Sequence, residues 1–193
     1  MGKGRLETFS DAVLAIMITI MVLELRPPQE TDIAALHPLL PVLLSYALSF
    51  LYLGIYWNNH HHMLASIHRV TGGILWANLH LLFWLSLVPF VTAWMGEHPF
   101  APTPASLYGV VLLMAGVAYL ILQQQILRSE GPGSILAQAL GHDLKGKASA
   151  ALYALAIGGA FVHPGIAYAL YFLVILMWLS PDRRIERALA TPS

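Results

Sequence analysis

The sequence has no cysteine and little charge: none of its 193 residues is Cys, and only 10% are Asp, Glu, Lys or Arg. The missing cysteines exclude a disulfide framework and a thiol nucleophile. A soluble domain carries about a quarter charged residues, so this chain lacks the polar surface to face water on all sides. Its formal net charge of zero provides no strongly basic face, and no nucleic-acid partner is expected.

Apolar residues take the place of the charged ones and make up 58% of the chain. A membrane-spanning helix needs roughly 20 mostly apolar residues, and six segments approach or exceed this length. The first of them is predicted to remain as a span, because Ser10 and Asp11 interrupt any signal-peptide core and no small-residue cleavage site follows. The predicted spans lie near residues 6–25, 38–60, 71–95, 104–126, 146–162 and 164–180.

The chain is therefore predicted to be an all-α integral membrane protein with six transmembrane helices in one domain, residues 1–193. Its last two spans are short and are separated only by a tight turn at His163-Pro164-Gly165. The polar stretch 134–145 is expected to form an amphipathic connector at the membrane surface. Residues 181–193 are expected to form a short cytoplasmic tail.

The basic residues predict the orientation of these spans, because cytoplasmic loops carry an excess of Lys and Arg. With the N-terminus inside, only Arg26 falls in an outer segment. The inner segments hold Lys3, Arg5, Arg69, Arg128, Lys145, Lys147, Arg183, Arg184 and Arg187. This asymmetry favours a multi-pass protein with both termini in the cytoplasm.

The first span has an aliphatic face. At about 100° per residue, Ala12, Ile16, Ile20 and Leu23 fall within a narrow arc, with Thr19 at its edge. These residues either contact lipid and other helices, as most aliphatic residues of a span do, or meet their symmetry mates and form a hydrophobic constriction. Periodicity alone does not separate the two interpretations.

Asp11 lies on roughly the opposite side of the same helix, in line with Glu7. A carboxylate at membrane depth is costly and seldom faces lipid. It acts either as a hydrogen-bond anchor within the subunit or as an ion or proton ligand, and its distance from the Ile16 face favours the anchor. Ser10 and Asp11 would then hold this helix against the other spans.

The second span ends in Trp57-Asn58-Asn59-His60-His61-His62. Consecutive histidines on a helix point about 100° apart, so a shared metal ion is not expected. Trp57 is better placed to interact with His60 or His61, three or four residues later. Asn78 in the third span is a candidate for a network with Asp11 and one of these histidines. No GxSxG or HExxH motif is present, and no enzyme is predicted.

Several motifs together resemble one family. They are Arg5-x-x-x-Phe9-Ser10-Asp11, Trp57-x-x-His60-His61-His62, Arg69-Val70, Leu75-Trp76-x-Asn78 and Pro89-Phe90-x-Thr92. In this combination the chain is similar to the prokaryotic relatives of the endolysosomal potassium channel called transmembrane protein 175. The resemblance covers essentially the whole chain and is strongest over residues 5–95.

The resemblance implies a potassium channel without a conventional filter loop, in the bacterial plasma membrane. It implies a pore lined by the first helix, with Ile16 at the narrowest point, Ile20 and Leu23 as the next layers, and Thr19 and Ile16 affecting selectivity. A chain with one six-helix unit is expected to form a homotetramer, to have K⁺ and other monovalent cations as permeant ions, and to need no cofactor. The residues expected in a structural network are Arg5, Phe9, Ser10, Asp11, Trp57, His60, His61 and Asn78.

One alternative belongs to another functional class. Asp11 and the histidines could serve a proton-coupled transporter or a proton pathway, because intramembrane carboxylates and imidazoles form proton relays. That interpretation predicts uptake that depends on a proton gradient and is lost when Asp11 is replaced by Asn.

Overall fold

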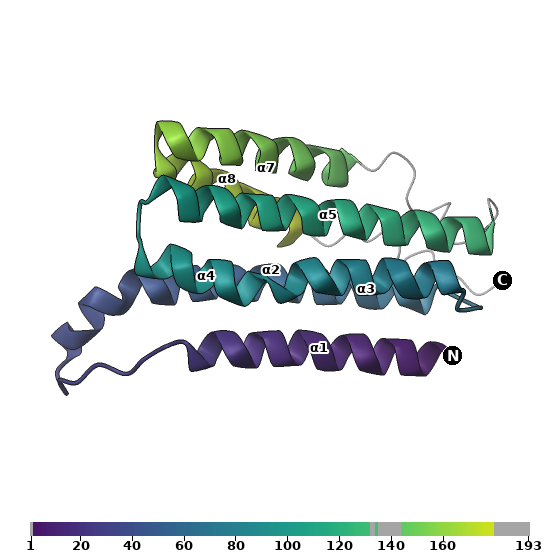
Figure 1. Ribbon diagram of the computed structural model, residues 1–193, viewed down its shortest axis with the longest axis horizontal. Coiled ribbons are helices and arrows are strands. Elements are labelled where there is room, and N and C mark those ends of the chain that lie inside the picture. The colour runs from purple at the N-terminus through teal and green to yellow at the C-terminus, as the bar shows by residue number, and fades with distance from the viewer. Residues whose placement is uncertain (1, 132–133, 135–143, 180–193) are drawn as a thin grey trace.

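The computed structural model describes residues 2–131, 134 and 144–179 (Figure 1). Every regular element in these ranges is a helix, and no strand occurs among them, which confirms the predicted all-α membrane class. The elements are α1 (Lys3–Leu23), the 3₁₀ helix η1 (Ile33–Leu39), α2 (Leu40–Ala65), α3 (Gly72–Ser86), α4 (Val88–Glu97), α5 (Pro102–Glu130), α7 (Leu144–Val162) and α8 (Pro164–Leu179).

Four helical stretches are long and apolar enough to cross a membrane: Lys3–Leu23, Ile33–Ala65, Gly72–Glu97 and Pro102–Glu130. They coincide with the first four predicted spans. The last two predicted spans coincide with α7, which has 19 residues, and α8, which has 16. Most of the predicted connector at 134–145 and the whole tail at 181–193 lie outside the described residues.

The third predicted span, residues 71–95, is not one continuous helix in the structure. The structure divides it at Leu87 into α3 and α4. Pro89 is the cause, because proline has no N–H to donate and its ring clashes with the carbonyl of the residue four positions earlier. The backbone bridges the break, since the Leu87 N–H donates to the Trp84 carbonyl at 3.3 Å and the Val91 N–H to the Leu87 carbonyl at 3.1 Å. The two helices follow one another in a line between α1 and α5 (Figure 1).

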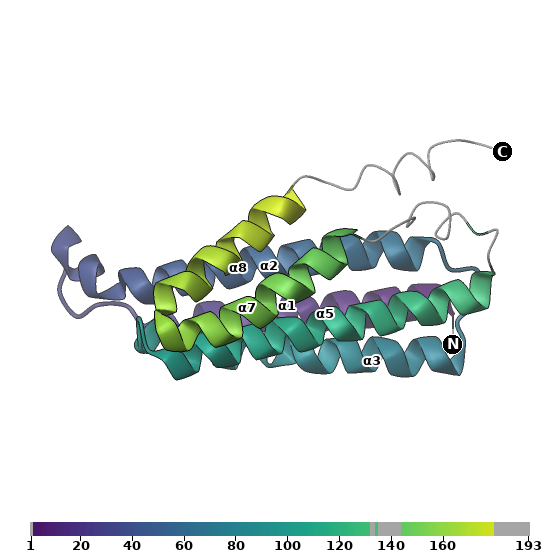
Figure 2. The same cartoon turned by 90° about the horizontal axis from the view of Figure 1, so that it is seen from above.

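The bundle is layered, with α1 along one side and the α7–α8 hairpin along the opposite side (Figures 1 and 2). The first helix packs on α2, α3 and α4, whereas α5 packs on α3, α4, α7 and α8. The hairpin closes at His163, whose carbonyl accepts from the Ile166 N–H at 2.9 Å. Within the described residues, this arrangement leaves one long side of α1 without a partner.

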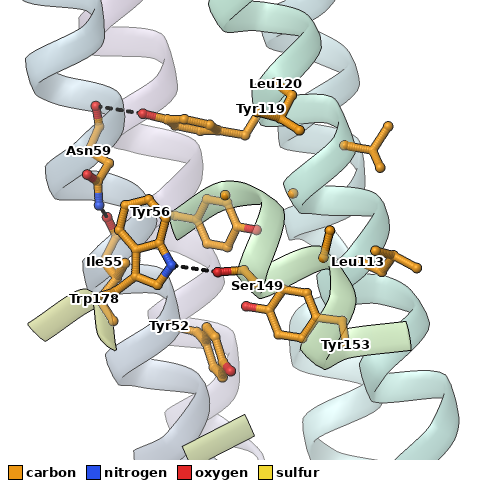
Figure 3. A pocket seen from close by; sticks show the side chains of 14 residues that line it. Tyr52, Ile55, Tyr56, Asn59, Leu113, Tyr119, Leu120, Ser149, Tyr153 and Trp178 are labelled. Carbon is orange, nitrogen blue, oxygen red and sulfur yellow. Dashed lines mark hydrogen bonds between the residues drawn. The ribbon is translucent and has the colours of Figure 1, made fainter. Parts of the chain in front are cut away.

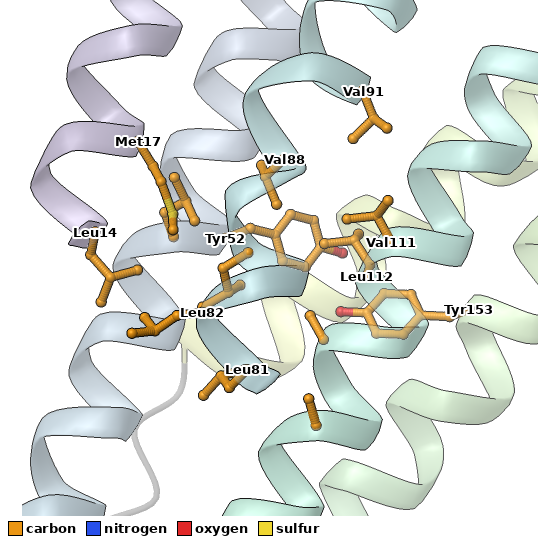
Figure 4. Packing of buried hydrophobic residues seen from close by; sticks show 14 of the residues in the cluster. Leu14, Met17, Tyr52, Leu81, Leu82, Val88, Val91, Val111, Leu112 and Tyr153 are labelled. Carbon is orange, nitrogen blue, oxygen red and sulfur yellow. The ribbon is translucent and has the colours of Figure 1, made fainter. Parts of the chain in front are cut away.

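Small residues let the helices approach closely, as in other membrane bundles. Ala105 and Ala115 of α5, Ala156 of α7 and Ala167 of α8 are all fully buried. A Cβ atom at Gly109 of α5 would collide with the Tyr171 hydroxyl of α8. Larger side chains fill the layer between α1 and α5, where Leu14, Met17, Leu82, Val88 and Leu112 belong to one cluster (Figure 4).

Candidate ion pathway on the first helix

The first helix has one buried stripe. Its buried residues recur every three or four positions, which is the spacing of one helical face: Leu6, Ser10, Leu14, Met17 and Met21. At the N-terminal end, the Lys3 ammonium donates to the Ala65 carbonyl at the end of α2, 2.6 Å away. A cation is favourable at that position because the carbonyls of a helix C-terminus carry partial negative charge. Sequence reasoning missed this contact.

The four predicted pore residues lie on the exposed side of α1. Ile16 is 57% exposed, Ile20 44% and Leu23 75%, and Thr19 is exposed beside them. They form one continuous stripe that points away from the bundle core. Nothing in the described part of the same subunit covers this stripe, so it is available to lipid or to another copy of the chain.

Thr19 already uses its hydroxyl proton. Its Oγ1 donates to the Ala15 carbonyl one turn earlier at 2.8 Å. This back-bond is common for threonine in a helix, and it leaves the oxygen lone pairs as the remaining polar feature. Thr19 is therefore an oxygen acceptor on an otherwise aliphatic stripe.

A groove runs beside this stripe between α1 and α4. Ile16 and Ile20 form one wall, and Phe90 and Trp94 form part of the other. Glu24, which follows α1, and Glu97, the last residue of α4, also line the groove. The sequence motif Pro89-Phe90 marks this segment of α4. Helical periodicity does not predict that the segment lies next to Ile16.

Behind the stripe, a buried hydrogen-bond network ties α1 to α2 and α3. Asn78 Nδ2 donates to Ser10 Oγ at 3.0 Å, and Ser10 Oγ donates to the Leu6 carbonyl at 2.9 Å. His60 Nε2 lies 2.7 Å from Asn78 Oδ1. Since an amide oxygen only accepts, the proton is on Nε2 and the imidazole donates. Ser10 and Asn78 are fully buried, and His60 is 2% exposed.

Asp11 makes a separate contact. The indole Nε1 of Trp57 donates to Asp11 Oδ1 at 3.0 Å. His61 stacks on that indole, with ring centroids 6.2 Å apart and an interplanar angle of 28°. Of the two histidines considered as partners of Trp57, His61 is therefore the one in contact, while His60 faces Asn78. Asp11 lies toward α2, away from the Ile16 stripe.

The remaining motif residues lie at the surface of the subunit. Phe9 is 46% exposed and Arg5 is exposed. Neither side chain takes part in the hydrogen bonds among the described residues. In those same ranges, no three His, Asp or Glu side chains lie close enough to hold a metal ion. The arrangement as a whole holds α1 in one rotation and presents an aliphatic stripe with one hydroxyl oxygen.

Comparison with known proteins identifies the family. The family model described as endosomal/lysosomal potassium channel TMEM175 matches residues 5–89. A protein from Chryseobacterium sp. (strain P1-3), named as a potassium channel, is 53% identical over 189 residues, which cover 98% of each chain. This chain belongs to the TMEM175 family. The resemblance carried by the Arg5 to Asp11 motif is thereby confirmed.

More distant TMEM175 relatives extend the comparison. The human endosomal/lysosomal proton channel TMEM175 is 26% identical over 189 residues, which cover 90% of this chain and 37% of the human one. The crystal structure of a lysosomal potassium-selective channel TMEM175 homologue from Chamaesiphon minutus aligns with a TM-score of 0.78 and 26% identity. That alignment covers 93% of this chain and 97% of the other. The fold is therefore that of a TMEM175 channel, a family of ion channels and not of enzymes.

Proposed function

We propose that this chain is a passive, potassium-permeable cation channel whose pore is lined by α1. The observation that carries the proposal is the exposed stripe of Ile16, Ile20 and Leu23 on a helix whose opposite side is fixed by buried hydrogen bonds. The relatives named as potassium channels, which include one from Streptomyces collinus at 28% identity, support potassium as the permeant ion.

In this proposal the constriction is hydrophobic, with Ile16 the narrowest layer. Aliphatic constrictions gate by dewetting, and they favour ions that give up hydration water more easily. The Thr19 oxygen then lies within one turn of Ile16, where it can replace part of the water that the ion loses. Ile20 and Leu23 continue the same stripe toward the end of the helix.

We propose a homotetramer as the conducting form. The chain covers nearly all of its Chryseobacterium relative but only 37% of the human protein. An α-helix with its side chains is about 10–12 Å across, so four copies of α1 around one axis leave only a narrow bore. The exposed side of α1 and the groove beside it are the surfaces that neighbouring subunits would cover. We place the protein in a bacterial plasma membrane with both termini in the cytoplasm, as its basic residues favour.

Ion flux from liposomes tests the proposal. Purified protein is reconstituted into vesicles with a K⁺ gradient and no proton gradient, and K⁺ efflux is followed with a potential-sensitive dye. A passive channel lets K⁺ leave until the membrane reaches the K⁺ equilibrium potential, which the dye reports, without any second ion gradient. Efflux that occurs only when a proton gradient is imposed contradicts the proposal and favours coupled transport.

The proton pathway is the second candidate, because the human relative is named a proton channel. Asp11 separates the two candidates. In the passive channel it anchors Trp57 and lies off the ion path, so Asp11→Asn retains K⁺ efflux. In a proton-coupled carrier the same variant abolishes uptake, because the asparagine cannot exchange a proton. Trp57→Phe is the matched control, since it removes the same hydrogen bond but keeps the carboxylate.

A further inference from the structure

A cavity lies on the far side of the bundle from the Ile16 stripe, among α2, α5, α7 and α8 (Figure 3). Its volume is about 70 Å³, and its lining is mainly aromatic and aliphatic. Gly116 of α5 keeps it open, because a Cβ atom there would meet only the Tyr56 hydroxyl, 3.8 Å away. Its lining includes Tyr56, Leu113, Gly116, Ser149 and Trp178.

Several polar groups around the cavity are hydrogen-bonded. Tyr119 donates to the Asn59 carbonyl at 3.3 Å, and the Trp178 indole donates to Ser149 Oγ at 2.9 Å. The Tyr56 hydroxyl has no hydrogen-bond partner among the described residues. Figure 3 shows the Tyr56 ring extending from α2 across the space toward α5 and α7. The Tyr56 phenol is therefore a polar group in an otherwise apolar setting.

One end of the cavity is basic. The ammonium of Lys145 lies 5.8 Å from the centroid of the Trp178 ring, and Trp178 lines the cavity. Lys147 is exposed two residues further along α7, about 200° around that helix from Lys145, and does not line the cavity. Tryptophan and lysine are typical of the level where a membrane meets water. This end of the cavity is therefore placed at the headgroup level, and its apolar part lies deeper.

We propose that this cavity is a binding site for an anionic phospholipid. One acyl chain enters between α2 and α5 and packs on Tyr56 and Leu113, and the headgroup phosphate binds the ammonium group of Lys145. The volume excludes a drug-sized ligand, which needs roughly 300–1,000 Å³, but accepts part of one hydrocarbon chain. Basic pockets between helices on the cytoplasmic side bind anionic headgroups in the same way. The site is separate from α1 and does not depend on the proposed conduction.

Native mass spectrometry of the delipidated, full-length protein in detergent tests the site. The probes are palmitoyl-oleoyl phosphatidylglycerol and the zwitterionic phosphatidylcholine with the same chains. We expect one phosphatidylglycerol per subunit to bind first, about fivefold more tightly than phosphatidylcholine, from the attraction of one lysine. In Lys145→Gln this preference disappears. Arg128→Gln, which removes an exposed cation at the end of α5, keeps it.

A second pair of variants tests the acyl-chain part. Gly116→Leu fills the cavity and weakens binding of both lipids, whereas Gly158→Leu on α7, where a side chain meets open space, leaves binding unchanged. Equal affinity of the two lipids for the wild type overturns the proposal, as does unchanged binding in Gly116→Leu or a retained preference in Lys145→Gln. If Gly116→Leu does not fold, Lys145→Gln still decides.

Discussion

Asn78 of α3 holds Ser10 of α1 through a hydrogen bond from Nδ2 to Oγ, 3.0 Å long and fully buried at both ends. A rotation of α1 by one residue would turn Ser10 by about 100° and break this bond. The same rotation sets the direction of Ile16, six residues along the helix. The bond therefore couples a polar motif on one side of α1 to the aliphatic stripe on the other.

Ser10→Ala should destabilise the protein by about 1 kcal/mol, because it leaves the buried Asn78 amide without its acceptor. The measurement is the thermal unfolding midpoint in detergent. Thr8→Ala is the control, since the Thr8 hydroxyl makes the same kind of bond to the Gly4 carbonyl but is exposed. An equal shift in the two variants would mean that the Ser10–Asn78 bond contributes nothing.

The spans and the two faces of α1 could be predicted from the sequence, because both depend on local hydropathy and helical period. It could not choose between His60 and His61 as partner of Trp57, since that choice depends on the rotation of α2 against its neighbours. Pro89 is the sequence signal for the break at Leu87, but a proline in a membrane helix does not always interrupt it. The cavity depends on what lies opposite Gly116, which is a property of packing alone.

At the cytoplasmic end of α5, as we orient it, Glu130 binds the loop between α2 and α3. It accepts from the His68 backbone N–H at 2.9 Å and from the His68 ring at 2.6 Å. Partial burial alone would raise the pKa of the Glu130 carboxyl, but the backbone and ring hydrogen bonds of His68 outweigh it and lower the pKa below the usual 4.5. Stability from this carboxylate is therefore fully present above pH 4.5 and is lost as the pH falls through the lowered pKa.

Glu130→Gln should lower the unfolding midpoint at pH 7 by an amount equivalent to less than about 1 kcal/mol, since the His68 side chain is largely exposed. The difference from the wild type should shrink as the pH is brought below 4.5. Glu30→Gln, at an exposed position outside the helices, should match the wild type throughout. If the difference in unfolding midpoint between Glu130→Gln and the wild type stayed constant with pH, the charge of the Glu130 carboxylate would not be its cause.

Ile16→Asn should increase the conductance and reduce the discrimination among monovalent cations, because a polar side chain keeps the constriction wet. Single-channel currents in planar bilayers measure both. Val22→Asn is the matched control: Val22 is also exposed, at 44%, but lies about 120° around the helix from Ile16. Currents that change as much in Val22→Asn as in Ile16→Asn would place the pore axis elsewhere.

Thr19 provides the last test, because it separates the role of its oxygen from that of its shape. Thr19→Val keeps the branched side chain and removes the oxygen, and it should bring the K⁺ to Na⁺ permeability ratio toward one while leaving a measurable current. Thr19→Ser keeps the oxygen and its bond to the Ala15 carbonyl, so it should retain the wild-type ratio. Reversal potentials under bi-ionic conditions give the ratio directly. A ratio that follows side-chain size, with Thr19→Val like the wild type and Thr19→Ser altered, would assign selectivity to the aliphatic constriction alone.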